Sequence, residues 1–173
     1  GTGGATAGLA VGGTPTPTNA NCEIWNGSSW TEVANLNSGR YALNSAGTST
    51  DGLVFGGSPE PAGVALTELW NGSAWTEVGD LNTARLQMAG AGTSTLNAIA
   101  FVGLSGSTYR AFTEDWNGAS WSEVGDLNTA RFAHGSAGSY TAALAYGGSI
   151  PGGNTQATEE WSGSSVLNNV LTD

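Results

Sequence analysis

The apolar residues of this chain fall into short runs that end in glycine, and polar segments separate the runs. In GLVFGG (52–57) and ALAYGG (143–148), large and small apolar residues alternate. Apolar residues on both sides of such a run predict a strand that is covered on both faces. No sustained helical period competes with this interpretation, and glycine recurs too often for a helix interior. The pattern therefore predicts short β-strands throughout.

The runs belong to a fourfold repeat. A tryptophan stands at positions 25, 70, 116 and 161, at intervals of 45, 46 and 45 residues, and a second tryptophan and an arginine keep the same spacing. The repeated residues are Trp25, Trp30, Trp70, Trp75, Trp116, Trp121, Trp161, Arg40, Arg85 and Arg131. We expect a single domain over 1–173, with repeats of approximately 1–40, 41–85, 86–131 and 132–173 and both ends cut inside a repeat.

Each copy indicates four strands. The first strand follows the arginine, the second is the apolar run, the third ends at the first tryptophan, and the fourth begins at the second tryptophan. Asn26-Gly27, Asn71-Gly72 and Asn117-Gly118 predict tight hairpin turns, since Asn and Gly accept a positive φ. We expect the paired indoles to lie on neighbouring strands and to cover the sheet of an adjacent repeat.

This combination of residues resembles the kelch-type β-propeller, and most closely a Gly/Asn/Thr-rich, lysine-free version of marine phage and bacterial proteins. Besides the arginines and tryptophans, the resemblance rests on the glycine pairs Gly12-Gly13, Gly56-Gly57 and Gly147-Gly148. It implies an all-β, kelch-like propeller of four blades, each of ~45 residues and four strands. The third copy departs from the pattern with Val102-Gly103, and the fourth departs from it with Ser162 and Val166.

Four blades are few for a propeller, so three arrangements stay open: a closed four-blade wheel, part of a larger wheel, or an assembly of copies. Wheels of this type often close by pairing one terminus with the other, and neither end here offers an obvious complete closing strand. An open arc would leave apolar faces uncovered. We therefore expect a homo-oligomer or part of a longer chain. The opening at Gly1, without a visible signal peptide, also favours a processed chain or a piece of a longer one.

Charge narrows the range of partners. The chain has 14 acidic and 4 basic residues, all of the latter arginine, and a net charge of −10. This balance argues against nucleic acid and anionic membrane surfaces, because both attract clustered Lys or Arg. No segment approaches the length of a transmembrane helix, so we expect no membrane insertion. The single cysteine, Cys22, excludes an internal disulfide.

Few residues could carry chemistry, and each has a structural interpretation. His134 replaces apolar residues of other copies, so we expect it to be packed. Cys22 replaces threonine and is interpreted as a small strand residue. The GDLN segments (79–82 and 125–128) hold one carboxylate each, which favours a turn over calcium. Glutamates that recur in the blades indicate an architectural role rather than a catalytic pair, and we expect each repeated arginine to contact a repeated glutamate or a blade carbonyl. We expect no catalytic residue, cofactor or metal.

The segments between the second and third strands differ most between copies, and we expect all four to emerge on one face of the wheel: 14–21, 58–65, 104–111 and 149–156. Tyr and Arg are favoured contact residues, and Arg110 is the one arginine outside the repeat spacing. The candidate ligand or partner residues are Pro59, Glu60, Pro61, Tyr109, Arg110 and Phe112.

These features favour a non-catalytic binding or structural module of an extracellular, cell-surface or virion-associated protein, such as a phage tail protein. Rigid blades would hold the variable loops against a glycan or protein partner. The alternatives are a propeller-type glycan-active enzyme and a purely architectural spacer.

Overall fold

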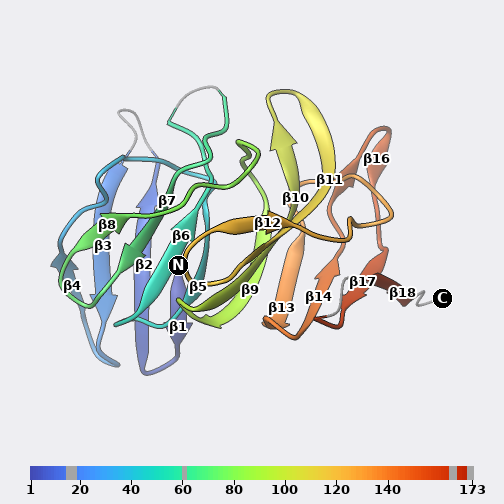
Figure 1. Ribbon diagram of the computed structural model, residues 1–173. Coiled ribbons are helices and arrows are strands. Elements are labelled where there is room, and N and C mark those ends of the chain that lie inside the picture. Colours follow the sequence, from blue (N-terminus) through green and yellow to red (C-terminus); the bar gives the residue numbers. More distant parts are fainter. Residues whose placement is uncertain (15–18, 60–61, 164–166, 171–173) are drawn as a thin grey trace.

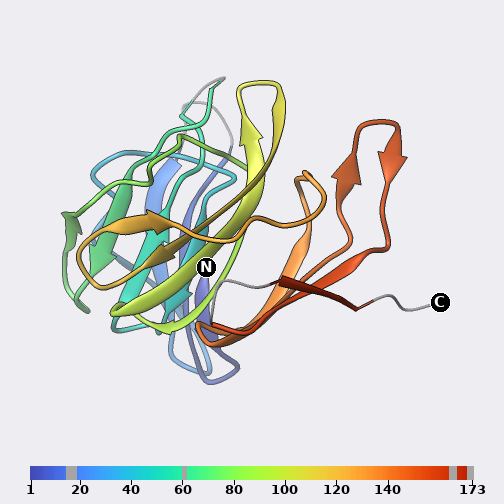
Figure 2. The same ribbon diagram turned by 45° about the vertical axis from the view of Figure 1, so that its right-hand side comes forward.

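The computed structural model describes residues 1–14, 19–59 and 62–163, and the backbone of 167–170. The described residues form four four-stranded antiparallel sheets and one two-stranded ribbon (Figure 1). The strands of each larger sheet lie in chain order, and the four sheets stand side by side as propeller blades (Figures 1 and 2). The predicted all-β architecture of four four-stranded blades is confirmed.

The strands have the following bounds. Blade 1 consists of β1 (Thr2–Gly4), β2 (Ala7–Gly13), β3 (Asn19–Trp25) and β4 (Trp30–Val33). Blade 2 consists of β5 (Asn44–Gly47), β6 (Gly52–Phe55), β7 (Thr67–Trp70) and β8 (Trp75–Glu77). Blade 3 consists of β9 (Ala89–Ser94), β10 (Asn97–Ser105), β11 (Thr108–Trp116) and β12 (Trp121–Glu123). Blade 4 consists of β13 (Gly135–Ser139), β14 (Ala142–Tyr146), β17 (Thr158–Trp161) and β18 (Leu167–Val170), and carries the ribbon β15 (Ser149–Ile150) and β16 (Gly153–Asn154).

The Asn-Gly turns hold the two tryptophans of a blade opposite each other. In blade 2, the Asn71 side-chain oxygen accepts hydrogen bonds from the two backbone N–H groups of Ser73 and Ala74, and Gly72 has a φ of +90°. Trp70 and Trp75 are therefore direct cross-strand partners, with ring centroids 5.2 Å apart. The same pairing occurs in blades 1 and 3. The hairpins expected from the sequence are present.

Neighbouring blades pack face to face in seams, each filled by an apolar cluster of described residues. We call the side of a blade toward the preceding blade its leading face and the other side its trailing face. In the central seam, the trailing face of blade 2 supplies Leu53 and Phe55, and the leading face of blade 3 supplies Ala100, Trp116 and Trp121. Equivalent clusters join blades 1 and 2 and blades 3 and 4. The core of the molecule is thus divided among the seams.

Both terminal segments form strands within their own blades, although the sequence offers no obvious complete closing strand at either end. β1 pairs with β2, and β18 pairs with β17. The short β1 has the sequence TGG, without an apolar residue. Its pairing with β2 needs only backbone groups, so the sequence gives no signal for this strand.

No apolar cluster of the described residues joins blade 4 to blade 1, and the described blades form an arc with two free end faces. No helix in the described residues is long and apolar enough to span a membrane.

Val102 replaces the first glycine of the pair that ends the second strand. The equivalent Gly56 and Gly147 have φ values of +62° and +66°, and Val102 retains this left-handed backbone with a φ of +44°. A β-branched residue is strained in that region. Val102 is fully buried in the seam between blades 3 and 4, so burial of its side chain offsets the strain.

Candidate functional site

A buried ionic cluster closes each seam, and the one between blades 2 and 3 is representative. Arg85 Nη2 lies 2.6 Å from Glu114 Oε1, and both side chains are buried. The second carboxylate oxygen accepts hydrogen bonds from the Asn82 backbone N–H at 2.6 Å and from its side-chain amide at 2.9 Å. Arg85 also donates to the backbone oxygens of Val102 and Phe112. One carboxylate thus holds the Asn-x-x-Arg segment that links two blades.

The same cluster recurs in the other two seams of the described blades. Its members are Asn37, Arg40 and Glu68 for blade 2 and Asn128, Arg131 and Glu159 for blade 4. Burial lowers the pKa of the Arg85 guanidinium, and the charge of Glu114 opposes this shift. Paired, buried carboxylates of this kind fix the geometry of a seam.

Sequence reasoning missed these asparagines, because it assigned the GDLN segments that hold Asn82 and Asn128 to turns. Asn82 lies in a GDLN segment, yet its side chain reaches Glu114, 32 residues further on. The available signal was the constant spacing of asparagine three residues before each repeated arginine. The aspartates of the same segments do act locally, since Asp80 and Asp126 each accept a backbone hydrogen bond from the third strand of their own blade.

The two tryptophans of a blade have different tasks. The first donates its indole N–H to a backbone oxygen in the turn before its own second strand, as Trp70 does to Ser49. The second reaches across the seam: Trp121 donates to the Thr67 hydroxyl of blade 2 and stacks edge-on against Phe55. Trp30 occupies this second position in blade 1, where no described blade precedes it, and its side chain is 51% exposed.

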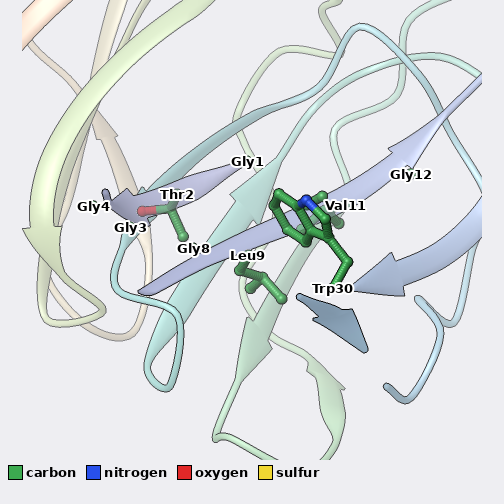
Figure 3. Close-up of a pocket in the computed structure, with 10 residues that line it drawn as sticks. Gly1, Thr2, Gly3, Gly4, Gly8, Leu9, Val11, Gly12 and Trp30 are labelled. Atoms are coloured by element: carbon green, nitrogen blue, oxygen red, sulfur yellow. The ribbon is translucent and has the colours of Figure 1, made fainter. Parts of the chain in front are cut away.

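The leading face of blade 1 is therefore a seam surface without a cover. A shallow hollow of about 520 Å³ lies over β1 and β2, and Trp30 forms part of its wall (Figure 3). Glu23 lies opposite Ala10 and Glu32 in the sheet, as Glu68 lies opposite Val54 and Glu77 in blade 2. Unlike Glu68, it is exposed.

The trailing face of blade 4 is the second free end. Leu144 and Tyr146 take the positions of Leu53 and Phe55, and they are 40% and 43% exposed. A hollow of about 280 Å³ lies beside Leu144, and Glu160 is at its edge. Each end of the arc thus shows a surface that the inner blades bury.

The long β10–β11 hairpin and the β15–β16 ribbon lie between the second and third strands of blades 3 and 4, and both point to the same side of the molecule (Figure 1). The corresponding connections of blades 1 and 2 include residues outside the described ranges. Tyr109 and Phe132 meet edge-on with ring centroids 5.2 Å apart, and the Arg110 guanidinium carbon lies 5.4 Å from the centre of the Phe112 ring. These four side chains are half-buried, so they brace the hairpin as well as line its surface. Pro59 is exposed, and Glu60 and Pro61 lie outside the described residues.

The remaining candidates of the sequence lie in the interior or half-buried. Cys22 is fully buried in the seam between blades 1 and 2, and burial raises the pKa of its thiol. Burial, aided by the charge of Arg131, lowers the pKa of His134 from 6.5 to about 4, and neither ring nitrogen has a hydrogen-bond partner among the described residues. Within the same residues, no three His, Cys, Asp or Glu side chains gather as a metal site would need.

Comparison with solved structures agrees with this geometry. The fold is similar to that of YjhT, a kelch-repeat propeller protein, with a TM-score of 0.75 over 96% of this chain at 12% sequence identity. The chain spans 65% of the YjhT chain. The sequence matches no protein-family model and no curated protein. The fold and seams therefore define an all-β propeller of kelch-like fold, and identity this low carries no function across.

Proposed function

We propose that the protein is a non-catalytic binding module whose blades hold the connections between second and third strands against a glycan or protein partner. The observation that carries this proposal is the contrast between the two kinds of segment. The repeated Arg-Glu pairs are buried in the seams, whereas two of the segments that vary from copy to copy, the β10–β11 hairpin and the β15–β16 ribbon, point to the same side of the molecule (Figure 1). Binding residues commonly lie on loops that a rigid scaffold positions.

The side chains on and beside the β10–β11 hairpin favour a neutral or polar partner. Tyr109, Phe112 and Phe132 offer aromatic surface beside the single arginine outside the seam clusters, Arg110. Aromatic and arginine side chains supply much of the binding energy at protein interfaces. A net charge of −10 without lysine disfavours polyanionic partners. An extracellular, cell-surface or virion setting is consistent with a surface of this kind, because binding through aromatic groups depends little on charges that salt screens.

The test is binding of the full chain to a glycan array and to extracts of cell-surface protein. We expect a double variant, Tyr109→Ala with Arg110→Ala, to weaken binding at least tenfold. The matched control is Ser28→Ala with Ser29→Ala, two exposed positions in an Asn-Gly turn of blade 1. Equal loss in both variants, or no binding to any glycan or surface protein, would contradict loop display and favour an architectural spacer.

A further inference from the structure

We propose that the leading face of blade 1 is a docking site for a further repeat of the same type. Its linking segment would bring an Asn-x-x-Arg motif to Glu23, and an apolar side chain of its sheet would cover Trp30. The inference does not depend on the proposed loop display, because it concerns a different face of the molecule.

The seams show what such a face binds. In each seam of the described blades, the glutamate of the third strand is within 2.6–2.8 Å of a guanidinium nitrogen. The other oxygen of that glutamate accepts both the backbone and the side-chain N–H of an asparagine three residues before the arginine. The construction is the same in all three, although the surrounding apolar residues differ. Recognition therefore rests on the Glu, Asn and Arg groups.

Blade 1 carries the glutamate and the tryptophan of this contact, at Glu23 and Trp30. The register of Glu23 within its sheet matches that of Glu68, and Trp30 matches Trp75 and Trp121 in position. Trp75 and Trp121 are 7% and 5% exposed, against 51% for Trp30. Glu23 has no ion pair or hydrogen bond with any described side chain, and the hollow over β1 and β2 lies on the same blade (Figure 3). The face thus continues an established interface.

A second copy of this chain does not fit as the occupant. Its trailing face could place Tyr146 against Trp30, in the relation that Phe55 has to Trp121. However, the three Asn-x-x-Arg arginines of the chain are at most 1% exposed, and each is already paired with its own glutamate. A copy docked in this way would cover Glu23 without supplying a cation, and an unpaired carboxylate is costly to bury. The motif has to come from a further repeat in which it is not already paired.

The length of the similar propeller fits this occupant. Four blades of this chain correspond to 65% of YjhT, which leaves a third of that chain for structure beyond the four. A further repeat would continue the arc from blade 1 in the same direction.

The test supplies the missing segment directly. A copy of residues 33–44, VANLNSGRYALN, is placed immediately before Gly1 of the full chain, so that its arginine precedes Leu9 by 13 residues, as Arg40 precedes Leu53. We expect the extension to raise the Tm by about 4 °C or more, because it would complete one ionic cluster and cover Trp30. The Trp30 emission should move to shorter wavelength, with the other six tryptophans providing a constant background.

The controls separate docking from unspecific stabilisation. Glu23→Gln, and replacement of the added arginine by Gln, should each remove most of the gain, and the two changes together should remove no more than either alone. Glu160→Gln, at an exposed carboxylate of blade 4, should leave the gain unchanged. A gain that survives Glu23→Gln, or no gain at all, would overturn the proposal.

A second arm uses the unextended chain. The peptide of residues 33–44 is titrated onto it by calorimetry, and we expect Glu23→Gln to weaken binding at least tenfold. Sedimentation of the chain without peptide tests the other occupant. If the chain self-associates and Trp30→Ser or Tyr146→Ser makes it monomeric, the face belongs to a second copy and the proposal is wrong.

Discussion

Phe55 of blade 2 meets Trp121 of blade 3 edge-on, with ring centroids 4.9 Å apart and an interplanar angle of 61°. The same indole donates a hydrogen bond to the Thr67 hydroxyl of blade 2 at 3.0 Å. One side chain thus contributes both an apolar contact and a hydrogen bond between two blades. The two blades are separate sheets, with no hydrogen-bonded pair of strands between them. Aromatic pairs in this geometry add to the free energy gained from buried area alone.

The position of an indole along the arc should decide how much it stabilises the protein. We expect Trp121→Ala to lower the free energy of unfolding by about 3–5 kcal/mol, because it leaves a cavity in the central seam and removes the bond to Thr67. Trp30→Ala, at the equivalent but exposed position, should change it by about 0.5 kcal/mol or less. Urea unfolding followed by circular dichroism measures both. Similar losses would show that Trp30 is covered in solution.

The buried ion pairs should respond to loss of one charge. Glu114→Gln leaves the Arg85 guanidinium buried without its counter-charge, and we expect a loss of about 3–5 kcal/mol in the free energy of unfolding. Glu23→Gln is the matched control, because Glu23 occupies the same register in blade 1 and is exposed. Its effect should be close to zero. A small effect of Glu114→Gln in the same urea experiment would mean that water reaches Arg85.

Valine in place of the glycine that ends a second strand should be tolerated only where neighbouring atoms leave room for its side chain. At Gly56, an added Cβ would lie 2.4 Å from Met88 Cε and 2.7 Å from the Arg85 backbone oxygen. We expect Gly56→Val to cost about 3 kcal/mol, from backbone strain and overpacking together. Gly106→Ala has a similar φ of +60° and open space around it, so it should cost only about 1 kcal/mol. Equal decreases in Tm for the two variants would mean that backbone strain alone, without overpacking, accounts for the loss of stability.

His134 should make stability depend on pH. Its pKa in the folded protein is about 4, below the ordinary value of 6.5, so the unfolded chain binds a proton more readily. Its contribution is therefore present above pH 6.5 and is lost as the pH falls toward 4, up to about 3 kcal/mol. We expect His134→Leu to flatten the difference between urea midpoints at pH 7 and pH 4.5. An unchanged pH dependence would show that the imidazole is hydrated.

Local signals in the sequence were enough for much of the fold. The Asn-Gly turns set the bounds of third and fourth strands, and the apolar runs ending in glycine set the second, because hairpin geometry depends on residues that are close in the chain. The weak strands were harder. β1 pairs through its backbone with few side-chain cues, so the sequence suggested a missing strand where the structure has one.

The contacts between blades could not be predicted from short segments of the sequence. Asn37 reaches Glu68 over 31 residues, and its neighbours in the chain favour a turn just as well. The exposure of Trp30 depends on which blade stands beside it and not on its own sequence context, which matches that of Trp75 and Trp121. Tyr109 and Arg110 were singled out as surface contacts, and the structure adds their internal partners Phe132 and Phe112.

Because every cohesive cluster bridges consecutive sheets, the molecule behaves as a linear stack in which each unit is held by its neighbours. Blades 2 and 3 are clamped from both sides, whereas blades 1 and 4 are clamped from one. In such a quasi-one-dimensional system, fraying starts at the termini and travels inward. Amide hydrogens of β2 and β14 should accordingly exchange with deuterium sooner than those of β6 and β10, although all four are second strands of their blades.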